Sequence, residues 1–186
     1  MKKAFLLAGV LFISVISTAC INNFAVQELN NKAKTFMDNG DYNSAIERLK
    51  SSIDLDEEVF ETHYNLAVAY TNAEDYLNAV KSYNDAIKLK PDFMDAYYSL
   101  AVCEANLAKD IISGELIVLQ DGTLEKSEID NDKKVNLSDD AKILVKEYLA
   151  DAISNYKKYL SESQQDSEDI EEEIEELTKL LDEYNK

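Results

Sequence analysis

The chain repeats itself at an interval of 34 residues. The stretch from Asp41 to Ile46 matches the stretch from Asp75 to Val80, position by position. A repeat of this length corresponds to one supersecondary unit, and such a unit buries its apolar face only when its neighbours stack on it. The repeat therefore predicts a short solenoid in the body of the chain.

Each repeat has the pattern of two helices joined by a turn. Apolar residues recur at helical spacing over 60–72 and again over 77–89. Small side chains let the two helices approach closely, and larger ones fill the space between them. Asp75 is placed to cap the second helix, and Pro91 prevents that helix from continuing. The chain has only one proline and four glycines, which favours a mostly helical fold.

Residues 60–93 resemble a tetratricopeptide repeat in both spacing and residue type. The residues that carry the resemblance are Leu66, Ala67, Tyr70, Ala79, Tyr83, Ala86 and Pro91. The resemblance implies an all-α, right-handed superhelix of about three helix-turn-helix repeats. The repeats are expected at 26–59, 60–93 and 94–162.

The third repeat is split by an insertion. Its first helix begins on schedule with Asp95 and Leu100, but the segment that matches the second helix of the preceding repeat appears only at Ala152–Leu160. The insertion is expected at about 111–137. Part of it, around Asp121-Gly122, predicts a β-hairpin, and an extended first helix is the alternative. Ser138 is placed to cap a lengthened second helix.

The tail over 166–186 predicts an acidic helix that caps the solenoid. Its apolar stripe consists of Ile170, Ile174, Leu177 and Leu181. A solenoid needs a polar-backed terminal unit to cover its last apolar face. The acidic face is expected to be solvated, and contact with a basic partner is the less favoured interpretation.

The first nineteen residues have the pattern of a signal peptide, with Lys2-Lys3 before an apolar segment too short to cross a bilayer. The segment Thr18-Ala19-Cys20 resembles a bacterial lipoprotein signal, although Ser17 replaces the usual aliphatic residue. The resemblance implies lipidation of Cys20, a tether over 20–25, and a place in the bacterial envelope. With two membranes, this would be the periplasmic face of the outer membrane. Plain secretion and an uncleaved anchor are the alternatives.

Charge and motif content narrow the classes of function. A net charge of -18 disfavours binding to nucleic acid, because phosphate neutralisation needs Lys and Arg. No catalytic triad, phosphate loop or metal-binding motif occurs, so no enzyme activity, cofactor, metal or small-molecule substrate is expected. His63 and Cys103 are predicted to pack in the core. The stretch 130–132 lacks the glycine and terminal glutamate of a calcium loop.

The resemblance implies a binding groove lined by the first helix of each repeat. The expected groove residues are Asn30, Lys34, Glu61, Tyr64, Asn65, Val68, Asp95, Tyr98 and Val102. Tyr64 and Tyr98 are 34 residues apart and offer large contact areas with polar tips. The alternative is that these two tyrosines only pack between neighbouring repeats.

Members of the family that bind chaperone tails hold a terminal carboxylate with Lys or Arg. Asn30, Asp95 and Ser99 stand at the corresponding places here, which disfavours an acidic C-terminus as ligand. The sequence thus predicts a membrane-anchored protein-interaction module or scaffold that binds a partner peptide or helix in the groove. The alternative is an accessory or regulatory subunit of an envelope enzyme or assembly machinery, with contact made by the insertion.

Overall fold

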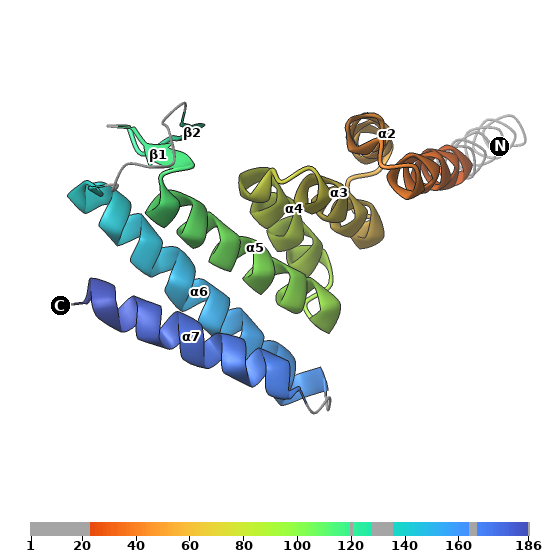
Figure 1. Cartoon of the computed structure of the whole chain (residues 1–186). Helices are drawn as coiled ribbons and strands as arrows, with labels where there is room; N and C mark the ends of the chain where they lie inside the picture. Colours follow the sequence, from red (N-terminus) through yellow and green to blue (C-terminus); the bar gives the residue numbers. More distant parts are fainter. Residues whose placement is uncertain (1–22, 120, 128–135, 164–166, 186) are drawn as a thin grey trace, which may run out of the picture.

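The computed structural model describes residues 23–119, 121–127, 136–163 and 167–185. A helix covers 23–38, and six further helices and one hairpin follow it (Figure 1). The helices are α2 (Tyr42–Leu55), α3 (Phe60–Asn72), α4 (Tyr76–Leu89), α5 (Met94–Ser113), α6 (Asp139–Ser163) and α7 (Glu168–Tyr184). The strands are β1 (Leu116–Val118) and β2 (Leu124–Lys126).

Each helix packs mainly on the next one along the chain, from α2 against α3 to α6 against α7. The layers follow one another across the molecule, with the amino-terminal helices at one end and α7 at the other (Figure 1). This sequential stacking confirms the predicted all-α superhelix of helix pairs.

The turns inside the first two repeats have the same backbone geometry. Asp41 accepts a hydrogen bond from the Ser44 amide at 3.1 Å, and Asp75 accepts one from the Asn78 amide at 3.3 Å. The predicted cap at Asp75 is therefore confirmed. The residue before each cap has positive φ, +75° at Gly40 and +57° at Glu74. Glycine adopts this left-handed conformation without the Cβ clash that Glu74 experiences there.

The insertion lengthens both helices of the third repeat. By the 34-residue period α5 would end near residue 106, yet it continues to Ser113, about two turns further. Helix α6 begins at Asp139, where the Ser138 hydroxyl accepts a hydrogen bond from the Ala141 amide at 3.2 Å, as predicted for its cap. An extended first helix and a hairpin, weighed as alternatives, are therefore both present.

The hairpin lies beyond the carboxyl end of α5 (Figure 1). Its strands are antiparallel, and Leu116 pairs with Lys126 while Val118 pairs with Leu124. Gly122 takes φ of +82° in the connecting turn, which requires a residue without a Cβ clash. The predicted hairpin around Asp121-Gly122 is thus confirmed.

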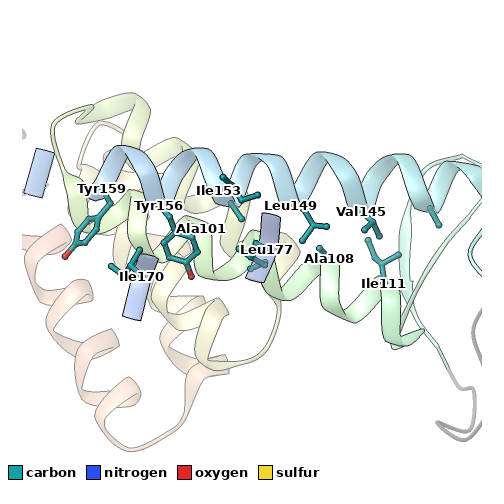
Figure 2. Close-up of a cluster of buried hydrophobic side chains, with 13 residues drawn as sticks. Ala101, Ala108, Ile111, Val145, Leu149, Ile153, Tyr156, Tyr159, Ile170 and Leu177 are labelled. Carbon is teal, nitrogen blue, oxygen red and sulfur yellow. The ribbon is translucent and has the colours of Figure 1, made fainter. Parts of the chain in front are cut away.

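Helices α5, α6 and α7 share one hydrophobic cluster. Figure 2 shows Val145, Leu149 and Ile153 of α6 lying along the small residues of α5, while Ile170 and Leu177 of α7 enter the same cluster. Both α7 residues are buried, so this helix covers the last apolar face as expected of a cap. A second cluster fills the space among the first helix and α2 to α5.

Candidate functional site

The predicted groove residues differ in how far they reach solvent. Lys34, Glu61, Asp95 and Tyr98 are exposed, and Tyr98 keeps 40% of its surface accessible. The remaining members of the predicted set are half-buried; these are Asn30, Tyr64, Asn65, Val68 and Val102. The exposed part of this face therefore presents one aromatic ring among three charged side chains.

Each of the two groove tyrosines has an edge-on tyrosine neighbour on the following helix. Tyr64 meets Tyr83 of α4 edge-on at 5.7 Å between ring centroids, and Tyr98 meets Tyr156 of α6 in the same way at 5.8 Å. Tyr64 also contacts Phe93, which leaves it half-buried. These contacts support the packing interpretation for Tyr64. Tyr98 instead rests on Tyr156 and Tyr159 with one side accessible.

Asn30 connects three helices. Its amide nitrogen has two hydrogens to donate and lies 2.9–3.0 Å from three acceptors, the Val26 carbonyl, the Ser52 hydroxyl and the Thr62 hydroxyl. Ser52 on α2 and Thr62 on α3 are fully buried, so these bonds satisfy polar groups that water does not reach. We therefore assign Asn30 a structural role between the first two repeats.

The residues predicted to pack in the core do so. His63 is buried and its Nε2 lies 2.9 Å from the Glu57 carbonyl oxygen. Cys103 is fully buried, and burial raises the pKa of its thiol to about 11. A thiol that stays protonated at neutral pH is a poor nucleophile, so Cys103 fits a packing role.

Glu104 is a buried carboxyl group that the sequence analysis missed. It lies on α5 with 4% of its surface exposed and accepts a 2.8 Å hydrogen bond from Asn155 of α6. Burial raises the pKa of Glu104 to about 8, although the bond from Asn155 lowers it. The repeat contains a signal for this site, because Glu104 lies 34 residues after Tyr70 at a core position.

The structure also contains an open cleft that sequence analysis did not predict. Its volume is about 1110 Å³, and it lies between α2, the turn from α3 to α4, the end of α5 and the hairpin. Polar and charged side chains alternate with apolar ones along its walls. Its lining includes Ile46, Lys50, Tyr70, Glu74, Asp75, Tyr76, Leu107, Asp110, Glu115, Leu116, Leu124 and Lys126.

The titratable groups that line the cleft are carboxylates, lysines and tyrosines. Burial raises the pKa of Asp110, and the nearby Glu115 and Glu74 raise it further. The lining includes neither a histidine nor a cysteine. Across the described parts of the chain, no three metal-ligating side chains come together as an ion would need.

Several predicted features lie outside the described residues. They are the signal segment 1–19, the lipidation site Cys20 and the 130–132 stretch. Within the described ranges, no helix has both the length and the apolar character that crossing a membrane requires.

Comparison with known proteins identifies the repeats. Residues 33–73 match the family model described as TPR repeat, and residues 60–93 match the model described as tetratricopeptide repeat. No curated protein matches the chain in sequence.

Solved structures resemble the fold over most of the chain. The second TPR domain of human RPAP3, in complex with an HSP70 peptide, is 16% identical with a TM-score of 0.59, covering 84% of this chain and 98% of that one. The first TPR of Spaghetti (RPAP3), bound to an HSP90 peptide, is 17% identical with a TM-score of 0.58, covering 84% and 92%. The Arabidopsis OM64 TPR domain is 12% identical with a TM-score of 0.57, covering 88% and 98%.

Such identities establish the fold alone. The family models match residues 33–73 and 60–93, and the structural likeness over most of the chain concerns the fold. The chain therefore contains tetratricopeptide repeats and folds as an all-α superhelix of the tetratricopeptide type.

Proposed function

We propose that this protein is a binding module that holds a peptide segment or helix of a partner protein against the first helices of its repeats. The observation that carries the proposal is Tyr98, a large aromatic side chain with 40% of its surface accessible. Its ring is held in place by Tyr156 and Tyr159, so little side-chain freedom remains to be lost on binding. Rigid tyrosines of this kind are frequent anchors of protein interfaces.

The structural relatives support the class of ligand. The RPAP3 and Spaghetti domains were solved with bound peptides, SGPTIEEVD and SRMEEVD. Both peptides end in acidic residues. In this chain Glu61 and Asp95 are exposed on the same face, and repulsion between like charges disfavours an acidic peptide there. The proposed ligand is therefore a neutral or basic segment with an apolar side chain for Tyr98.

The test uses cross-linking from a defined position. A photoreactive amino acid replaces Tyr98 in one version of the full chain and Leu89, which is also 40% exposed, in another. Illumination in the producing cells should give a discrete adduct from position 98 and none from position 89. The same adducts from both positions would indicate nonspecific contact and contradict the proposal.

A second set of variants separates the roles of the ring and the hydroxyl. Tyr98→Phe should retain partner capture and Tyr98→Ala should lose it, because the aromatic area makes the contact. Melting temperatures of both variants check that the fold is intact. If a folded Tyr98→Ala variant still captures the partner fully, Tyr98 is not part of the binding face and the proposal is contradicted.

We further propose that a lipid on Cys20 holds the module at the bacterial envelope. The support is sequence alone, since the apolar segment is followed by Thr18-Ala19-Cys20. Cys20→Ala should release the protein from sedimented membranes of a bacterial host. If the variant still sediments with membranes, the lipid is not the anchor.

A further inference from the structure

The cleft beside the hairpin is a product of the insertion in the third repeat. Its wall on one side is α2, with Ile46 and Lys50, and its base is the turn that joins α3 to α4. The opposite wall consists of Leu107 and Asp110, which lie on the two extra turns of α5, together with the hairpin. A repeat of ordinary length would leave this side open, so the inserted residues create the cleft.

Three carboxylates of the cleft form no salt bridge within the described chain. Glu74, Asp110 and Glu115 form no salt bridge with any residue in the described ranges. They lie close enough to influence one another, because Glu115 and Glu74 add to the effect of burial in raising the pKa of Asp110. The same three groups, after burial, raise the pKa of Tyr76. With Asp75, four carboxylates line the cleft against the two lysines Lys50 and Lys126, so the lining carries an excess of negative charge.

The two lysines of the cleft cancel only part of this charge. Lys50 lies over the ring of Tyr70, with its Nζ 5.5 Å from the ring centroid. Lys126 lowers the pKa of Asp110, but it is the weakest of the influences on that group. Asp75 also lines the cleft, and its carboxylate already accepts hydrogen bonds from the amide and side chain of Asn78.

Tyr70 supplies a hydroxyl group at the wall of the cleft that is not hydrogen-bonded to the described chain. Only 8% of its surface is exposed, and it lines the cleft. Its hydroxyl forms no hydrogen bond with the rest of the described chain. The hydroxyl oxygen is not one of the buried polar atoms that lack a partner, so it reaches solvent although the rest of the side chain is buried. A ligand group can replace water as its hydrogen-bond partner.

We propose that this cleft binds a short basic segment of a partner protein, with one Lys or Arg side chain held among Glu74, Asp110 and Glu115. Charge-assisted hydrogen bonds to the carboxylates fix the cation. The Tyr70 hydroxyl bonds to the backbone of the segment, and apolar neighbours pack on Ile46 and Leu116. This site is separate from the face around Tyr98, so each can be tested without the other.

The probes are four pools of fluorescent seven-residue peptides, acetylated and amidated, with random apolar residues around a fixed central residue. The central residue is Arg, Lys, Leu or Glu. Fluorescence polarisation with the full chain in detergent should show saturable binding for the Arg and Lys pools, at least about tenfold tighter than for the Leu and Glu pools. Equal affinities for all four pools, or no saturable binding, would overturn the proposal.

Matched variants locate the binding site. Glu74→Gln/Asp110→Asn/Glu115→Gln removes three negative charges at the cleft, and Glu171→Gln/Glu172→Gln/Asp182→Asn removes three from exposed positions on α7. The cleft variant should lose the preference for Arg and Lys, about tenfold in affinity, while the α7 variant keeps it. An equal loss in both would show only attraction to the net charge of the chain.

Two further variants test whether the peptide binds in the cleft. Tyr70→Phe removes only the hydroxyl and should weaken the Arg pool severalfold without unfolding the chain. Tyr98→Ala, compared with the cleft variant, shows which of the two sites the Arg pool occupies. If Tyr98→Ala abolishes the preference for Arg and Lys while the cleft variant keeps it, the peptide occupies the predicted groove and the cleft proposal is wrong.

Discussion

The buried carboxyl group of Glu104 allows a quantitative test of the packing between α5 and α6. Glu104→Gln keeps the size of the side chain and an oxygen that accepts the Asn155 bond, but it removes the ionisable group. The wild-type carboxyl has a pKa of about 8 in the folded chain, against an ordinary value of 4.5. The variant therefore isolates the free energy of ionising a group in this position.

The sign of the effect follows from proton binding. A carboxyl whose pKa is higher in the folded chain binds its proton more tightly when folded, so its contribution is complete below pH 4.5. Stability then decreases as the pH rises through the window up to about 8, because only the unfolded chain ionises freely. Each pH unit inside this window corresponds to ~1.4 kcal/mol.

Urea denaturation at pH 5 and pH 8 measures the effect. The stability of Glu104→Gln relative to wild type should increase by about 3 kcal/mol between these two pH values. All other titrating groups are common to both proteins and cancel in the difference. A relative stability that is the same at both pH values would show that Glu104 is solvated, and the described contact between α5 and α6 would then be incorrect.

Three further substitutions test the repeat itself, each by its effect on the urea midpoint. Ala79→Leu should destabilise the chain by about 1–3 kcal/mol, because Ala79 is fully buried where α4 packs on α3. No change would indicate the wrong register. Asp75→Ala should cost about 1 kcal/mol by removing the cap of α4, and a loss no greater than for exposed Asp92→Ala would argue against the cap. Asn30→Ala should cost about 1–3 kcal/mol because it removes the donor to two buried hydroxyl groups. Asn31→Ala, one residue away and exposed, is its control, and equal costs would contradict the bridging role.

Most of the fold could be predicted from the 34-residue period. It predicted that Tyr156 takes the place of Tyr83, and the structure gives both residues the same edge-on tyrosine neighbour. It also predicted the cap at Asp75 and the interruption of the third repeat. These properties depend on residues that are near in sequence or repeat at a fixed interval, so a local pattern contains them.

The candidate sites were only partly contained in the sequence. Tyr64 and Tyr98 have equivalent positions in the repeat, yet Phe93 covers one, and the other keeps 40% of its surface accessible. Glu104 occupies the position that Tyr70 holds in the preceding repeat. Its hydrogen-bond partner, Asn155, lies on α6 and is 51 residues further along the chain. A sequence pattern predicts which face of a helix points to the core. It does not predict how completely neighbouring side chains cover each residue on that face.

By itself, the sequence determined the helix pairs, their caps, the hairpin and the order of stacking, because each follows from local spacing and turn chemistry. Only the tertiary structure showed where the insertion lies in space relative to the first two repeats. It lengthens α5 and places the hairpin against the end of that helix, which brings Asp110 and Glu115 to Glu74 and Tyr70 across a cleft. The physical reason is that burial and mutual repulsion of these groups depend on distances through space between segments that are remote along the chain.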